Sequence, residues 1–164
     1  MAKTKVISVA NQKGGVGKST SVYCIGAGLA LDGKKVLLID VDPQGDLTKM
    51  LGLRKPHDLP LALGDVMSDV VSGKEIAEHT EIMHHHEGFD FVPGNRALSA
   101  VETGLVNVMS RETVLRQYVD SVKTIMTMYC WTAALPWVCW SSTLWLPRTM
   151  FLSLSRRIIW RQRT

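Results

Sequence analysis

Runs of apolar residues near the start of the chain have the lengths and boundaries of alternating strands and helices. Residues 6–10 are mainly apolar and read as a buried strand. Residues 34–40 begin with two lysines and then carry a continuous apolar run, which is typical of a parallel strand covered on both faces. Residues 19–31 suit a helix whose small side chains let it pack closely on a sheet, and Asp32 and Gly33 end it. Strand, helix and strand make a right-handed βαβ unit. The pattern predicts an α/β fold with a mainly parallel sheet flanked by helices.

Three later features have structural rather than chemical interpretations. The run His84-His85-His86-Glu87 could suggest a metal site. Consecutive side chains rarely converge on one ion, so we interpret the run as a solvated loop. Cys24 lies among small and apolar residues of the first helix and is interpreted as an inert packing residue. Residues 111–122 have apolar side chains at helical spacing, which predicts a face in the core. That face consists of Val114, Leu115, Tyr118, Val119 and Val122.

A glycine-rich stretch at residues 12–20 joins the first predicted strand to the first predicted helix. Glycines let a backbone turn tightly and bring its N–H groups close to a polyphosphate, and the helix adds its positive N-terminal end. In such a loop Lys18 can reach the β- and γ-phosphates of ATP, and Ser19 can offer its hydroxyl to Mg²⁺. A chance glycine-rich loop is the alternative, but it leaves the shared register of strand, lysines, serine and helix unexplained. The residues predicted to bind the nucleotide are Lys13, Gly14, Gly15, Val16, Gly17, Lys18, Ser19 and Thr20.

Two acids, Asp40 and Asp42, follow the second predicted strand. Ligands of parallel sheets bind at the carboxyl ends of the strands, so both acids should emerge beside the phosphate loop. Carboxylates near phosphates repel them unless a metal or water lies between. We therefore expect one aspartate to support the Mg²⁺ shell and the other to orient a water. A turn built from Asp, Pro and Gly is the alternative; it explains Pro43 and Gly45 but not two acids on the phosphate side.

These two motifs together resemble those of the ParA/MinD superfamily of ATPases. A standard P-loop needs glycine at position 12, whereas this chain has Gln12 and opens its loop with Lys13, similar to the deviant Walker A pattern K-G-G-x-G-K-[ST]. Asp-x-Asp-Pro-Gln-Gly at residues 40–45 resembles the ParA-type partition ATPases in particular. Residues 64–67, 88–95 and 97–122 resemble the helices, the strand and the Pro-x-Asn turn that follow in that family. The resemblance covers residues 3 to about 123.

The resemblance implies a P-loop NTPase that binds ATP and Mg²⁺, forms an ATP-dependent homodimer and hydrolyses ATP to ADP in chromosome or plasmid partition. It implies two catalytic residues, Lys13, which contacts the nucleotide of the other subunit, and Asp42, which holds the attacking water. It implies that Ser19 contacts the metal and that Asp40 lies in the metal's second shell. The implied partners are a ParB-like activator and non-specific DNA. The implied location is the cytoplasm, at the nucleoid, with no membrane.

Composition changes abruptly near Lys123. Residues 1–123 hold 14 Lys and Arg and 15 Asp and Glu, whereas residues 124–164 hold five arginines, no acid and all five tryptophans. The net charge of +4 is therefore a property of the later segment and weak evidence for nucleic-acid binding by the rest. Three cysteines without paired spacing argue against a disulfide framework and favour a reducing cytoplasm.

A change of reading frame explains this break. A P-loop ATPase of this family next needs an apolar strand that ends in aspartate, the Walker B element, but Asp120 is the last acid of the chain. If the third base of each codon is read with the first two of the next, the codons of residues 128–132 must encode Val-Leu-Leu-Asp. The next codons permit Pro-Ser-Leu, and those of Trp137 and Val138 must encode Gly. The resulting phrase, Val-Leu-Leu-Asp-x-x-Pro-Ser-Leu-Gly, resembles the family's Walker B strand and the turn after it.

We therefore predict two regions, with the P-loop fold truncated in its C-terminal half. Residues 1–123 are the N-terminal part of a ParA-like ATPase domain, and residues 124–164 are an aberrant, poorly ordered tail in which residues 129–134 can still pair as a strand. The chain as written should then be an incomplete and inactive ATPase. Two alternatives remain. One is a membrane-tethered nucleotide-binding protein that uses the uncharged residues 125–146 as an anchor, and the other is a non-functional fragment.

Overall fold

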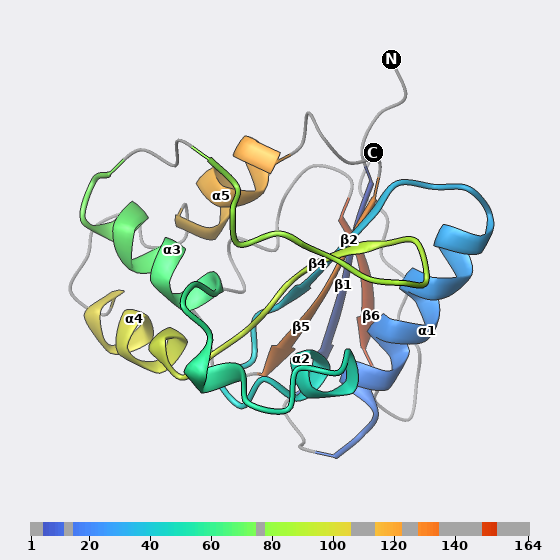
Figure 1. Cartoon of the computed structure of the whole chain (residues 1–164), viewed down its shortest axis with the longest axis horizontal. Helices are drawn as coiled ribbons and strands as arrows, with labels where there is room; N and C mark the ends of the chain where they lie inside the picture. The colour runs from blue at the N-terminus through green and yellow to red at the C-terminus, as the bar shows by residue number, and fades with distance from the viewer. Residues whose placement is uncertain are drawn as a thin grey trace.

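A single sheet with helices on both faces forms the computed structural model of the chain, which describes residues 5–11, 15–74, 78–105, 114–122, 128–134 and 149–153 (Figure 1). In this part the strand order is β3-β4-β2-β5-β1-β6, and every neighbouring pair is parallel except β3 with β4. The predicted α/β class with a mainly parallel sheet is confirmed. The elements are β1 (Lys5–Asn11), α1 (Lys18–Leu31), β2 (Val36–Asp40), α2 (Asp46–Met50), the 3-10 helix η1 (Pro56–Asp58), α3 (Leu63–Val71), β3 (Met83–His84), β4 (Asp90–Val92), α4 (Ala97–Leu105), α5 (Val114–Val122), β5 (Met128–Ala134) and β6 (Thr149–Ser153).

Helix α1 covers one face of the sheet through an unusually close contact. A Cβ atom added to Gly26 would lie 2.5 Å from Cδ2 of the buried Leu38 on β2. Gly28, two residues later, has nothing within 4 Å of such an atom. The predicted close packing by small residues is therefore present at Gly26 and not at Gly28. The helix ends at Leu31, with Asp32 as its C-cap and Gly33 next, as predicted.

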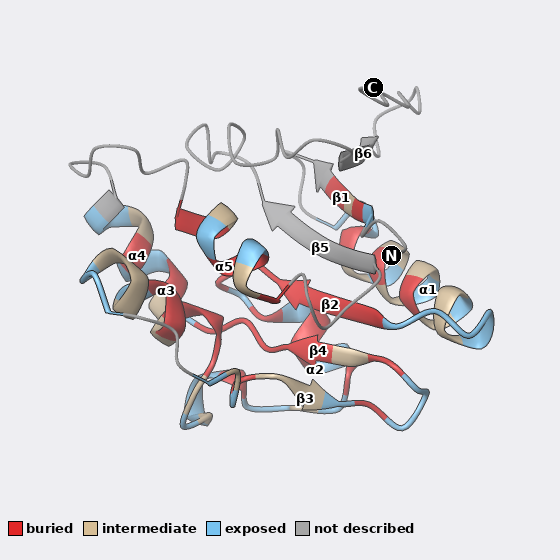
Figure 2. Ribbon diagram, turned by 90° about the horizontal axis from the view of Figure 1, so that it is seen from above, coloured by how far each residue is buried: buried red, intermediate tan, exposed pale blue. Residues whose placement is uncertain are grey.

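Strand β2 serves two separate cores because its alternate residues face opposite sides of the sheet. All five of its residues are buried, as Figure 2 shows. Leu37 and Ile39 pack with residues of α3, α4 and α5, whereas Val36 and Leu38 pack with residues of α1 and α2. This double burial is why the strand reads as a continuous apolar run.

Helix α5 packs on the second face by the predicted apolar stripe, whose five residues are all buried. The hydroxyl of Tyr118 donates a hydrogen bond of 2.6 Å to Oε1 of Glu81, a carboxylate with 1% exposure. His79 Nδ1 lies 3.2 Å from the same oxygen. The buried acid thus joins α5 to the segment before β3.

Two strands come from the segment that we expected to be poorly ordered. β5 lies between β2 and β1 and is parallel to both, so the pairing foreseen for residues 129–134 occurs. β6 was not foreseen; it pairs with the other side of β1, from Val6↔Thr149 to Ala10↔Ser153. The remaining positions of residues 124–164 lie outside the described residues.

None of the helices within the described ranges combines the length and the apolar character needed to cross a membrane. Residues 128–134 form β5 in the middle of the sheet. A tether over residues 125–146 would need the same residues in a spanning helix, so that alternative is not favoured.

The interpretation of the histidine run holds only in part, and that of Cys24 was wrong. His85 is buried, with 8% exposure, because its ring stacks on Phe89 at a centroid distance of 4.6 Å. The histidine run is therefore only partly solvated. Among the described residues, no group of three or more His, Cys, Asp or Glu side chains is placed to hold a metal ion. Cys24 is exposed on α1 rather than packed in the core.

Candidate nucleotide-binding site

The glycine-rich loop turns sharply between β1 and α1. Gly15 and Gly17 have φ angles of 68° and 86°, a backbone region that side chains with a Cβ rarely adopt. A Cβ atom at either position would meet nothing within 4 Å, so the backbone conformation rather than crowding requires glycine there. Lys13 and Gly14, predicted to contact the nucleotide, lie outside the described residues.

The first turn of α1 offers backbone N–H groups to an anion. The helix starts at Lys18, its N-cap is Gly17, no side chain caps it, and its first turn contains no acid. Lys18 is buried, Ser19 is half-buried and Thr20 is exposed. Uncapped amides, the helix dipole and a lysine in the same turn are the features by which a helix N-terminus binds phosphate.

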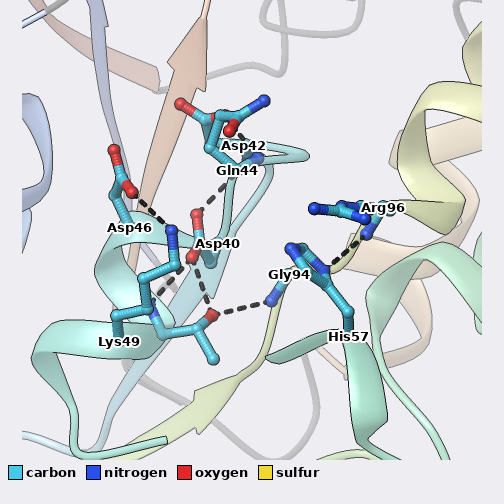
Figure 3. A network of polar contacts seen from close by, with 9 residues as sticks. Asp40, Asp42, Gln44, Asp46, Lys49, His57, Gly94 and Arg96 are labelled. Carbon is cyan, nitrogen blue, oxygen red and sulfur yellow. Dashed lines mark hydrogen bonds and ion pairs between the residues drawn. The ribbon is translucent and has the colours of Figure 1, made fainter. Parts of the chain in front are cut away.

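Asp40 ends β2 and is held firmly in place. It has 1% exposure. Its Oδ2 accepts hydrogen bonds from Thr48 N at 2.9 Å and Thr48 Oγ1 at 2.7 Å, and its Oδ1 accepts one from Asp42 N at 3.3 Å (Figure 3). A buried carboxylate needs such donors to offset its desolvation. Their number fixes its orientation.

Asp42 is half-buried and forms a turn with the residues that follow. Its Oδ1 accepts a 2.9 Å hydrogen bond from Gln44 N, and its carbonyl accepts one of 2.9 Å from Gly45 N. The turn that we considered as the alternative to a chemical role is therefore present. The turn and a role in chemistry are compatible, since the turn uses one carboxylate oxygen.

The strand register places the site at the carboxyl ends of β2, β5 and β1, which are neighbours in the middle of the sheet. Asp40 of β2 pairs with Thr132 of β5, and Asn11, the last residue of β1, pairs with Ala134. The carboxyl ends of the three strands thus meet where the glycine-rich loop leaves β1, as expected of parallel sheets.

The residues fit a nucleotide with a bound divalent cation. The lysine and the first-turn amides match phosphate oxygens, and the Ser19 hydroxyl and the two carboxylates are the oxygen donors that Mg²⁺ prefers. Sequence analysis missed Thr48, which contacts Asp40 from α2. A threonine eight positions after the acid carries no local signal, because the helix that brings it back is only five residues long.

The region of known similarity is the first three quarters of the chain. The family model AAA_31, described as AAA domain, matches residues 4–129. The sporulation initiation inhibitor protein Soj of Bacillus subtilis (strain 168) is 40% identical over 119 residues, which make up 73% of this chain and 45% of Soj. The chromosome partitioning protein ParA of Caulobacter vibrioides is 36% identical over 119 residues, 73% of this chain and 43% of ParA. The chain thus spans less than half the length of these relatives.

Several solved structures share the fold of this chain. Cobyrinic acid a,c-diamide synthase from Mycobacterium smegmatis, with bound ATP analogue and magnesium, has a TM-score of 0.80 and 30% identity over 93% of this chain and 60% of its own. A plasmid partition protein from Borrelia burgdorferi has a TM-score of 0.70 at 21% identity over 92% of this chain and 64% of its own, which shows a shared fold. The chain therefore belongs to the AAA domain family, and its first three quarters are similar in sequence to Soj and to the chromosome partitioning protein ParA.

Proposed function

We propose that the chain is the nucleotide-binding part of a ParA-like partition ATPase that binds ATP with Mg²⁺. One observation carries the proposal. The uncapped N-terminus of α1, which includes the buried Lys18, lies at the carboxyl ends of the strands, where Asp40 and Asp42 follow β2. The ATP-analogue complex of the synthase supports it, because that protein shares this fold at 30% identity.

We assign the residue roles by charge and, for the described residues, by position, whereas the role of Lys13 rests on the family resemblance alone. Lys18 and the first-turn amides hold the β- and γ-phosphates, Ser19 contacts the metal, and Asp40 stands in its second shell. When bound, Mg²⁺ neutralises charge on the phosphate oxygens. Asp42, held by its turn beside the loop, orients the attacking water. Lys13 contacts the nucleotide of the other subunit in an ATP-dependent homodimer.

The assembly proposed for the whole protein rests on its relatives. The similarity to the chromosome partitioning protein ParA supports a role in partition, of a chromosome or of a plasmid. A ParB-like activator, non-specific DNA and nucleoid association in the cytoplasm belong to the same proposal.

We further propose that residues from about 123 onward are translated out of frame. The shifted aspartate takes its last two bases from codon 132, so it would replace Thr132, which pairs with Asp40 across the sheet. That is the strand end at which a Walker B acid would serve the metal. Without it, the chain as written lacks a carboxylate that hydrolysis needs.

Nucleotide binding is tested with Lys18→Ala. Loss of the lysine charge should weaken ATP binding at least ~10-fold, since charge-assisted hydrogen bonds to phosphate are lost. Isothermal titration of this chain and of a frame-restored protein with ATP and MgCl₂ measures the effect. Lys74→Ala is the matched control, because Lys74 is exposed and pairs with Asp69 away from the loop. Unchanged affinity in Lys18→Ala would remove the phosphate-binding assignment.

A further inference from the structure

The hydroxyl of Thr48 lies between the Asp40 carboxylate and a turn from a distant part of the chain. Thr48 is fully buried on α2. Its Oγ1 is 2.7 Å from Asp40 Oδ2 and 2.9 Å from the backbone nitrogen of Gly94, which is 46 positions further along the chain. Figure 3 shows these contacts as two dashed lines that meet at one oxygen.

The direction of both hydrogen bonds is fixed. The Gly94 N–H can only donate, so the Thr48 oxygen accepts there. A hydroxyl has one proton, which leaves that proton for Asp40. Asp40 Oδ2 therefore accepts, and the chain of donors runs from Gly94 through Thr48 to the carboxylate. This order suits a charged Asp40.

The turn that carries Gly94 packs closely against Asp40 and Asp42. A Cβ atom on Gly94 would lie 2.6 Å from the Asp40 carbonyl oxygen, 3.0 Å from that of Asp42 and 3.1 Å from Asp40 Cγ. Backbone atoms cannot move aside as a flexible side chain does. The turn therefore holds its N–H group at a fixed place beside Thr48.

The same turn is anchored on α3. Asn95 Nδ2 donates to Asp65 Oδ2 at 3.0 Å, and that oxygen also accepts from Ala62 N at 2.9 Å. Leu63 N donates to the Pro93 carbonyl at 2.9 Å. Thr48 thus receives its hydrogen bond from a backbone that α3 holds in place.

We propose that Thr48 is a positioning residue for Asp40: its hydroxyl, oriented by the Gly94 N–H, holds the carboxylate in the direction that supports Mg²⁺ beside the nucleotide. The inference rests on the proposed function, because it assigns Asp40 to the metal. Outer-shell residues of this kind change metal affinity without touching the ion.

The test compares Thr48→Val, which keeps the shape and removes the hydroxyl, with Thr48→Ser, which keeps the hydroxyl. Binding of ATP to the full 164-residue chain is measured by calorimetry in EDTA and across a MgCl₂ titration. Thr48→Val should need ~10-fold more Mg²⁺ for its half-maximal effect, with ATP affinity in EDTA unchanged. Thr48→Ser should stay close to the unsubstituted chain. Thr103→Val is the matched control, because it removes an exposed hydroxyl bonded to Ser99 on α4.

A second readout does not depend on the metal. Amide hydrogen exchange at Gly94 should accelerate in Thr48→Val and stay slow in Thr48→Ser, because only the first loses the acceptor. If Thr48→Val fails to fold, Thr48→Cys, whose thiol is a weak donor, takes its place. A lower melting temperature with an unchanged Mg²⁺ midpoint would mean a merely structural role and overturn the inference. If the unsubstituted chain bound no ATP, the proposed function would fall first.

Discussion

Asp40 and Asp42 differ in how firmly the fold holds them, and this difference agrees with the separate roles that we propose for them. Asp40 is buried and accepts three hydrogen bonds from Thr48 and Asp42. Asp42 is half-buried and uses one oxygen in a turn with Gln44. A fixed carboxylate suits a metal shell, whereas a partly exposed one suits a water that must enter and leave.

In a frame-restored protein, Asp42→Ala should bind ATP and dimerise but hydrolyse it at least ~100-fold more slowly, because only the positioning of water is lost. Lys13→Ala should instead impair dimerisation and turnover while leaving monomer binding. Single-turnover hydrolysis and light scattering with ATP measure the two effects. Full turnover by Asp42→Ala would move the catalytic role to another residue, with Asp40 the next candidate.

His85 should make stability depend on pH. Burial, followed by repulsion from His86, lowers the pKa of His85 below its ordinary value of 6.5. The unfolded chain then binds more protons than the folded chain. The contribution of neutral His85 to the free energy of unfolding is therefore fully present above pH 6.5 and decreases as the pH falls below that value. His85→Phe should flatten this dependence when urea midpoints at about pH 5.5 and about pH 7.5 are compared. An equal loss with His85→Phe, or a flattening with the exposed His57→Gln, would contradict this origin.

At the scale of elements, α1 offers a matched pair of glycines. Gly26→Ala drives a methyl group into the buried Leu38, which should cost ~1–3 kcal/mol by overpacking and outweigh the gain in helix propensity. Gly28→Ala meets no atom within 4 Å and should gain up to ~1 kcal/mol. Urea denaturation of both variants checks the order. If Gly26→Ala were the more stable of the two, the close approach of α1 to β2 would be incorrect.

Local pattern predicted the elements whose signals are continuous in the chain. β2 and α5 follow directly from an apolar run and a helical stripe, and the phosphate loop follows from its glycines. Contacts that join distant positions could not be predicted in this way. The Thr48–Gly94 hydrogen bond spans 46 positions, and the burial of His85 depends on Phe89 folding back onto it. The exposure of Cys24 depends on which side of α1 faces the sheet.

At the scale of the molecule, β5 is the element on which we expect activity to depend. It fills the central place between β2 and β1, so the sheet is continuous, but its sequence supplies Thr132 opposite Asp40 where the shifted frame supplies an acid. The backbone of the site and its chemistry are thus separable. The proposal implies that the chain keeps the backbone of the site and lacks part of its chemistry.

The most direct test compares this chain with a protein whose reading frame is restored by one nucleotide near codon 123. The account predicts that the restored protein hydrolyses ATP and melts cooperatively. The chain as written should show no turnover above background, because the strand end beside Asp40 carries no acid, and should melt at lower temperature or without a cooperative transition. Equal turnover and equal cooperative melting in both proteins would contradict the account and make residues 124–164 a genuine part of the protein.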